Sequence, residues 1–308
     1  MKNILLLGGN GYIGSRLMLD LEENFKTTVV DLNWFSEKKC QVIDFNHLSK
    51  KQISEYDVVI LLAGHSSVKM CQNDRISSFN NNVRNFVNLL EKLSEKQKFL
   101  YASSSSVYGD TKNKIVDEKY DSFVLNNYYD LTKQIIDLYA IKSNLNYYGL
   151  RFGTVNGWSP NLRNDVMINS MVDSCAKDGH IKLYVKNINR PILGIHDLTR
   201  AIKCILTSGE DHPGIYNLAS FNSTAEEISR GVSSIINKPV FEYDTNKIEK
   251  ITNEKMQTNP YNFSIDSTKF QKNYNFTFRD TIETITEELI SKYEQSTRSS
   301  RGEDKKYE

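Results

Sequence analysis

The chain has 308 residues, 39% of them hydrophobic, which suits one compact enzyme domain or two close lobes. Lysine and arginine total 39 and aspartate and glutamate total 38, so the net charge of +1 gives no electrostatic reason to bind nucleic acid or an anionic membrane. The sequence shows no membrane-length apolar run, signal peptide, CxxC motif or helical histidine pair. We therefore expect a cytoplasmic protein without a catalytic metal.

The first half of the chain alternates short apolar runs with longer helical patterns. Strands are expected at 3–7, 27–30, 58–62, 99–102 and 147–152, and helices at 13–21, 83–93 and 128–140. The runs at 4–7 and 58–62 are apolar at every position, which is typical of strands buried on both faces of a parallel sheet. The sequence thus predicts an α/β fold with a doubly wound parallel sheet of Rossmann type.

The second half is more irregular and indicates a smaller, interleaved C-terminal lobe that binds the substrate. Two of its segments, 190–206 and 214–219, look as if they return to the sheet. We therefore assign 1–157 plus about 189–219 to the sheet domain and 158–188 plus about 220–295 to the lobe. Residues 296–308 contain almost nothing apolar and are expected to form a disordered tail.

A glycine-rich turn, Gly-Gly-Asn-Gly-Tyr-Ile-Gly at 8–14, joins the first strand to the first helix. Glycines there let the backbone approach a pyrophosphate, and the helix N-terminus offers unpaired N–H groups to it. Asp31 follows the second strand, where a carboxylate accepts both ribose hydroxyls and repels a 2'-phosphate, so NAD is favoured over NADP. Asp44 is placed either to reach the adenine edge or to form a turn.

Tyr129 and Lys133 are four residues apart on a predicted helix, so their side chains share one face. A cation near a phenol favours the phenolate, which can act as a base. A strand upstream runs into four serines, 103–106, at the expected carboxyl edge of the sheet. A serine there can hydrogen-bond a substrate hydroxyl while the phenolate removes its proton.

Together these residues resemble the extended short-chain dehydrogenase/reductase family, in particular its NAD-dependent nucleotide-sugar epimerases and dehydratases. The resemblance implies a catalytic triad of Ser104, Tyr129 and Lys133. The cofactor contacts that it implies are Gly8, Gly11, Tyr12, Ile13, Gly14, Asp31, Asp44, Phe45, Leu62, Ala63, Gly64, Asn82, Ser103, Tyr129 and Lys133. The substrate contacts that it implies are Ser105, Ser106, Thr154, Arg163, Asn169 and Arg190.

The reaction implied by the resemblance is oxidation of a sugar hydroxyl, most often at C4, with NAD as the hydride acceptor. Dehydratases of the family carry Asp and Glu at the positions of Ser105 and Ser106, whereas this chain has two neutral serines. Small neutral residues fit a 4-epimerase with tightly bound, recycled NAD. They equally fit a 4-dehydrogenase that releases the 4-keto sugar, and a non-catalytic NAD-binding sensor is the alternative of a different class.

The expected partners are a nucleotide-diphosphate sugar and a second copy of the chain. No residue identifies the base, so UDP-, GDP- and dTDP-linked sugars stay open. In relatives, the helices corresponding to 83–93 and 129–139 pair with those of a second subunit as a four-helix bundle. Apolar residues such as Phe86, Leu90 and Leu138 lie on more than one side of these helices, and we predict a homodimer that binds neither nucleic acid nor membrane.

Overall fold

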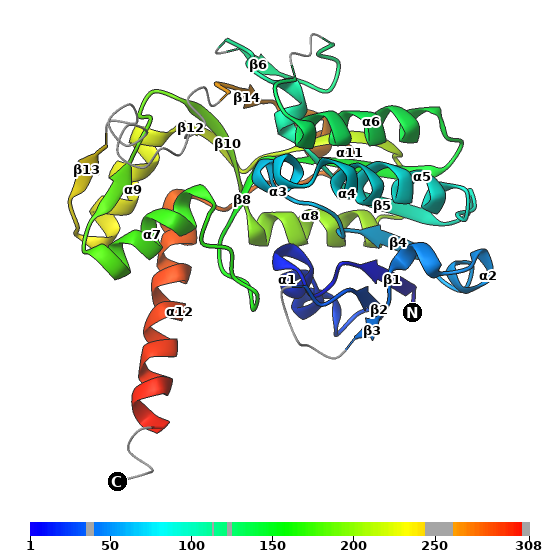
Figure 1. The fold of residues 1–308 in the computed structure, drawn as a ribbon, viewed down its shortest axis with the longest axis horizontal. Helices are drawn as coiled ribbons and strands as arrows, with labels where there is room; N and C mark the ends of the chain where they lie inside the picture. Colours follow the sequence, from blue (N-terminus) through cyan, green and yellow to red (C-terminus); the bar gives the residue numbers. More distant parts are fainter. Residues whose placement is uncertain (35–39, 113, 122–124, 244–260, 304–308) are drawn as a thin grey trace.

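The computed structural model describes residues 1–34, 40–112, 114–121, 125–243 and 261–303, with side chains up to residue 295. Its centre is a seven-stranded, all-parallel sheet in the order β11-β7-β5-β4-β1-β2-β3 (Figure 1). The strands are β1 (Asn3–Leu7), β2 (Lys26–Asp31), β3 (Gln41–Val42), β4 (Val58–Leu61), β5 (Lys98–Ser104), β7 (Asn146–Phe152) and β11 (Gly214–Leu218). The predicted doubly wound Rossmann-type sheet is confirmed, and its strand order reverses between β1 and β4.

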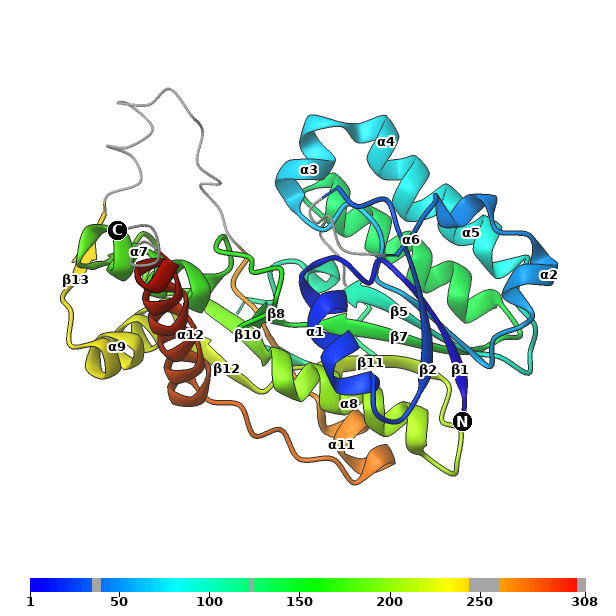
Figure 2. The same ribbon diagram turned by 90° about the horizontal axis from the view of Figure 1, so that it is seen from below.

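Helices cover both faces of this sheet (Figure 2). One face carries α2 (Lys50–Ile53), α3 (Val68–Asn73), α4 (Arg75–Phe79), α5 (Asn85–Leu90) and α6 (Tyr128–Lys142), and the other carries α1 (Tyr12–Leu21), α8 (Ile195–Thr207) and α11 (Thr268–Tyr274). Each face has its own apolar core. In α8, for example, Ile195, Leu198, Ile202 and Ile205 recur at helical spacing and are all buried.

The helix predicted at 83–93 is built differently. A π-helical turn, η2 (Asn80–Arg84), precedes α5. The side chain of Asn82 on this turn accepts a hydrogen bond from the backbone N–H of His65 at 2.8 Å and donates one to Thr132 at 3.1 Å. Hydrophobic periodicity does not reveal such a turn, because it depends on hydrogen bonds to two other segments.

The smaller lobe contains β8 (Thr154–Asn156), β10 (Asn189–Gly194) and β12 (Phe221–Thr224) in one sheet, and β9 (Ile181–Leu183) and β13 (Val240–Glu242) in another. Helices α7 (Met167–Asp178), α9 (Ala225–Ile236) and α12 (Ile282–Glu303) enclose a further apolar core. A separate pair, β6 (Ile115–Val116) and β14 (Ser264–Ile265), lies above the large sheet in Figure 1.

The division into lobes at our expected bounds stays a prediction. Strand β10 and helix α11 pack differently from what those bounds imply. Strand β10, which we expected near the large sheet, pairs with β8 and β12 instead. Helix α11, which we assigned to the lobe, packs against β11 through Phe270. The chain therefore crosses between the two parts more often than its composition suggests.

The final helix is α12, which is assigned up to Glu303. The disordered tail expected at 296–308 stays a prediction, and residues 304–308 lie outside the described part. Ile285 and Leu289 anchor its first turns in the lobe core.

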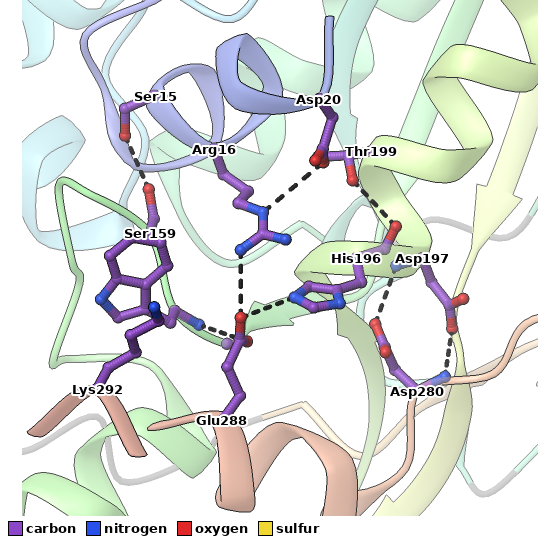
Figure 3. A network of polar contacts seen from close by, with 12 residues as sticks. Ser15, Arg16, Asp20, Ser159, His196, Asp197, Thr199, Asp280, Glu288 and Lys292 are labelled. Atoms are coloured by element: carbon purple, nitrogen blue, oxygen red, sulfur yellow. Dashed lines mark hydrogen bonds and ion pairs between the residues drawn. The ribbon is translucent and has the colours of Figure 1, made fainter. Parts of the chain in front are cut away.

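Polar contacts also join α12 to the large sheet domain (Figure 3). The Glu288 carboxylate accepts hydrogen bonds from Arg16 of α1 at 3.2 Å and from His196 of α8 at 2.8 Å. Hydrogen bonding and proximity to Glu288 raise the pKa of His196 above its usual value. The helix that follows the glycine turn is thus tied to the last helix of the chain.

In the described part of the chain, no helix has the length and apolarity needed to cross a membrane. The same residues contain no group of three histidine, cysteine, aspartate or glutamate side chains that could hold a metal ion.

Candidate active site

A cavity of about 340 Å³ opens at the carboxyl ends of the parallel strands, where the strand order reverses. Residues after β1, β2, β4, β5 and β7 line it. Open α/β sheets bind their ligands at such a switch point, because the loops on either side diverge and leave a crevice. The cavity brings together the glycine turn, Asp31 and the serine-rich loop, which are far apart in the sequence.

The glycine turn is constrained from two sides. Gly8 has a φ of +89°, and a Cβ there would lie 2.4 Å from the Ala63 nitrogen. A Cβ on Gly14 would lie 2.3 Å from the Gly8 oxygen, which keeps α1 close to the strand end. A Cβ on Gly11, in contrast, would have its nearest non-neighbouring contact among the described residues at 3.5 Å, on the Gly8 oxygen, and Gly11 lines the cavity. Space for a bound group therefore explains Gly11 better than internal packing does.

Two carboxylates lie at one end of the cavity. The Asp31 oxygens accept backbone N–H groups of Asn10 at 2.9 Å and Asn33 at 2.8 Å, which fixes the carboxylate at the end of β2. Each oxygen keeps a lone pair, so both ribose hydroxyls can still be bound. Asp44 lines the cavity too, and it also caps the turn at 45–47, so both roles that the sequence left open are compatible with its position.

Tyr129 and Lys133 face the other end of the cavity from the first two turns of α6. The Lys133 ammonium donates to the Ala102 oxygen at 2.8 Å and lies 5.8 Å from the centre of the Tyr129 ring. Burial lowers the pKa of Lys133 to about 8, partly offset by Asp137. Burial also raises the pKa of Tyr129 to about 12, while Ser104 and Arg163 act in the opposite direction.

Ser104 is the last residue of β5, and Ser105 and Ser106 begin the 3-10 turn η3 (Ser105–Tyr108). The Ser104 hydroxyl lies 2.7 Å from that of Ser106, which in turn donates to Asp130 of α6. Burial raises the pKa of Asp130 to about 6, against hydrogen bonds from Ser106 and Asn127 that lower it. The serine-rich loop is therefore connected to a buried carboxyl group.

Most predicted contacts line this cavity, and three do not. The Asn82 side chain lies behind it and holds His65 and Thr132. The Asn169 amide bonds the backbone of Gly157 and Arg163, so it shapes the loop that carries Arg163. Arg190 donates to the Tyr261 oxygen and lies over the Phe263 ring. The direct ligand contacts assigned to Asn82, Asn169 and Arg190 stay predictions.

Sequence reasoning missed other residues of the cavity. Trp34 and His65 line it with their rings 5.8 Å apart, and Phe263 lines it too. Asp130 is hidden behind the wall. Phe263 arrives from the far end of the chain, and no local pattern announces it.

These features define a dinucleotide-dependent enzyme site on a doubly wound sheet. A family model described as "NAD dependent epimerase/dehydratase family" matches residues 4–219, so the chain belongs to this family. UDP-glucose 4-epimerase 2 of Oryza sativa subsp. japonica is 32% identical over 161 residues, which cover 44% of this chain and 39% of that protein. Protein CapI of Staphylococcus aureus is 28% identical over 229 residues, covering 65% of this chain and 67% of that one.

Among solved structures, UDP-glucuronic acid 4-epimerase from Bacillus cereus in complex with UDP-glucuronic acid and NAD superposes with a TM-score of 0.79. It is 20% identical and covers 95% of this chain and 99% of its own. This likeness shows the shared fold.

NAD is the cofactor of this family, and the residues present fit it. The glycine turn leaves the backbone open to a pyrophosphate, and Asp31 is presented for the ribose. The Ser103 hydroxyl lies buried on the cavity wall without a hydrogen-bond partner among the described residues. A buried hydroxyl without a partner costs free energy, which a polar group of the bound cofactor would recover.

Proposed function

We propose that the protein is a nucleotide-sugar 4-epimerase with tightly bound, recycled NAD. One observation carries the proposal: Ser104, Tyr129 and Lys133 line the same cavity as the glycine turn, so a sugar hydroxyl held beside the triad also faces the cofactor site. The matched curated relatives include epimerases of UDP-sugars, and a UDP-linked sugar is the substrate class that we propose. The chain spans only 39% of the first of these relatives.

The residues of the chain account for the proton transfers. Tyr129 removes the proton of the sugar 4-hydroxyl and later returns it, while Ser104 hydrogen-bonds the reacting oxygen. The Lys133 ammonium beside the phenol ring favours the phenolate. When bound, NAD supplies a reversible hydride acceptor and, in its oxidised form, a positive charge that favours the phenolate further.

The choice of epimerisation rests on the residues beside the triad. Ser105 and Ser106 line the cavity with small neutral side chains. Neither can act as the acid and base that eliminate water in the dehydratases that the chain resembles. Such side chains let the 4-keto sugar rotate, so that the hydride returns to the opposite face of its C4 carbonyl. Release of the 4-keto sugar, which would make the protein a dehydrogenase, is the second outcome that the test must separate.

Proton NMR in deuterated buffer tests the proposal. The NAD-loaded protein is mixed separately with UDP-, GDP- and dTDP-sugars. We expect the C4-inverted sugar, without deuterium on carbon, from UDP-sugars. A 4-keto sugar that accumulates only with an added oxidant would make the protein a dehydrogenase, and deuterium at C3 or C5 would contradict the roles given to Ser105 and Ser106. NAD binding with no reaction of any sugar would favour the non-catalytic sensor.

The homodimer also belongs to this proposal. Apolar side chains are exposed on neighbouring helices of one face: Ile76 and Phe79 on α4, and Leu131, Leu138 and Ile141 on α6. Phe86, Leu89, Leu90 and Ile136, in contrast, belong to the core. Light scattering at micromolar concentration should show a dimer that Leu138→Glu dissociates, and a monomeric wild type would refute the dimer.

All four cysteines are free thiols, which is compatible with the cytoplasmic location that we predict.

A further inference from the structure

A chain of hydroxyl groups leads from the proposed catalytic phenol to a buried carboxyl group. Tyr129 and Ser104 line the same cavity, and Ser104 lies near enough to the Tyr129 phenol to lower its pKa. The Ser104 oxygen lies 2.7 Å from the Ser106 oxygen, and Ser106 is bonded to Asp130. Asp130 is 0% exposed and does not line the cavity. It can therefore influence the reaction through the groups that it contacts or through its charge, which acts on Tyr129.

The number of protons and lone pairs on the Ser104 hydroxyl forces the hydrogen bonds of this series of hydroxyls to run in one direction at a time. A serine hydroxyl has one proton to donate and two lone pairs that accept. One lone pair of Ser104 is used by the backbone N–H of Ser106 at 3.2 Å. One proton and one lone pair remain for two hydroxyl neighbours, Tyr129 and Ser106. If Ser104 donates to one of them, it must accept from the other.

The protonation of Asp130 selects the direction. An ionised carboxylate only accepts, so Ser106 then donates to Asp130 and accepts from Ser104, which in turn accepts from the Tyr129 hydroxyl. A neutral carboxyl group donates to Ser106, and each hydroxyl then donates toward Tyr129. Only in this second state does Ser104 present its proton to a Tyr129 phenolate or to a reacting sugar oxygen.

We propose that Asp130 is a positioning residue that controls Ser104, because the proton of Ser104 points toward the reaction centre only when Asp130 is protonated. The proposal rests on the proposed function, since it concerns the same catalytic hydroxyls. Its proton movements balance. As the Tyr129 O–H bond breaks, an O–H bond forms on Ser104, the proton of Ser104 passes to Ser106, and that of Ser106 passes to Asp130. One negative charge moves from the carboxylate to the phenolate.

The surroundings of Asp130 suit a group that changes its protonation state. Its second oxygen accepts from the Asn127 amide, and the nearby Tyr261 lowers its pKa. The charged or titratable side chains that face it are Arg190, Tyr129, Tyr261 and Cys71. None of these forms an ion pair with it among the described residues, and the pKa of about 6 follows mainly from burial.

Asp130→Asn is an informative variant because its orientation is fixed. The Asn127 amide donates to one oxygen of Asp130, so the new amide oxygen should occupy that position. The new NH2 group then faces Ser106 and donates to it, as a neutral carboxyl group would. The variant therefore holds Ser104 as a donor toward Tyr129.

The experiment is a pH titration of the NAD-loaded protein, followed by the near-ultraviolet absorbance of tyrosinate. Subtracting the same titration of Tyr129→Phe isolates Tyr129 from the other tyrosines. A new hydrogen bond to the phenolate should lower the half-titration pH of Tyr129 by about one unit in Asp130→Asn. An unchanged or raised half-titration pH would overturn the proposal.

Ser106→Ala separates the hydroxyl chain from simple electrostatics. It leaves Asp130 charged but frees Ser104 to donate to Tyr129, so it should lower the half-titration pH by a similar amount. The double variant should show no further shift of the half-titration pH. Ser106→Thr keeps the hydroxyl, so Tyr129 should titrate in it as in the wild type. If Asp130→Asn alone shifts the titration and Ser106→Ala does not, the effect acts through space and the proposal fails.

This titration needs no sugar, so it separates the two proposals. The expected shifts without turnover of any nucleotide sugar would refute the proposed function but leave the control of Ser104 intact. Epimerase activity without the shifts would support the proposed function and refute the control of Ser104 by Asp130. If Asp130→Asn does not fold, Ser106→Ala alone still decides the question.

Discussion

The two turns at the start and in the middle of α6 each carry a buried aspartate, and the two differ in their partners. Asp137 accepts hydrogen bonds from the Arg151 guanidinium at 2.8 Å and from the Tyr101 hydroxyl at 3.0 Å. Asp130 has hydroxyl and amide partners. Both are 0% exposed, and both lie within four residues of Lys133. The Asp137 carboxylate forms a buried ion pair, whereas burial without an ion pair raises the pKa of Asp130 to about 6.

The largest expected effect separates the catalytic end of α6 from its exposed surface. Tyr129→Phe removes the proposed base and should lower kcat by about 10²- to 10⁴-fold while NAD stays bound. The neighbouring Tyr128 is exposed over Arg75, so Tyr128→Phe is the matched control and should keep wild-type kcat. Turnover of Tyr129→Phe equal to that of the control would disprove the assignment of the base.

The next effect concerns stability at the structural position. Asp137→Asn leaves the buried Arg151 guanidinium without its anion, which should lower the free energy of unfolding by about 3–5 kcal/mol. Urea unfolding at neutral pH measures this. Asp130→Asn is the matched control, because it is an equally buried substitution on the same helix. If Asp137→Asn lowered the free energy of unfolding less than Asp130→Asn does, the structural role assigned to Asp137 would be wrong.

The pH dependence of stability distinguishes Asp130 from Asp137 further. The pKa of Asp130 rises from 3.8 to about 6 on folding, so the folded state binds the proton more tightly. Between these pH values this group makes wild-type stability fall as pH rises, by about 3 kcal/mol in total. Asp130→Asn should therefore gain that amount relative to wild type from acid to neutral pH. Parallel stability curves for the two proteins would contradict the raised pKa.

The smallest effect is expected where the charges are half-exposed. The pKa of His196 is raised by Glu288, so this pair stabilises the fold fully below pH 6.5 and loses its contribution as pH rises through the folded-state pKa. The His196 side chain is 42% exposed, and His196→Gln should cost about 0.2–1 kcal/mol at low pH only. Urea unfolding on both sides of that pKa tests this, and an equal loss at high pH would exclude an ionic origin.

The comparison also shows what a sequence can reveal. The glycine turn, Asp31 and the pair of Tyr129 and Lys133 are recognisable because each works through its own short segment. Asp130 stands in the same motif, yet its role depends on Ser106 and Tyr261, which other segments bring to it. Residues whose neighbours come from distant parts of the chain are not accessible to motif reasoning.

The same limit applied to the fold. Apolar runs predicted the large sheet because β1, β4, β5, β7 and β11 are mostly buried, whereas β2 and β3 at its edge are not. They did not predict that β10 joins a separate small sheet with β8 and β12, although β10 is longer than β1 or β4. The apolar pattern of a strand does not indicate which strand it pairs with.

The π-helical turn at Asn80–Arg84 has a consequence for insertions and deletions. A π turn contains one residue more than the α-helical turn that it replaces. Deleting Asn80 or Asn81 would restore a regular helix and rotate Asn82 by about 100° relative to what precedes it. Its amide would then leave the backbone of His65 and the side chain of Thr132. A single-codon loss in this segment should therefore be tolerated worse than the substitution of any exposed residue in it.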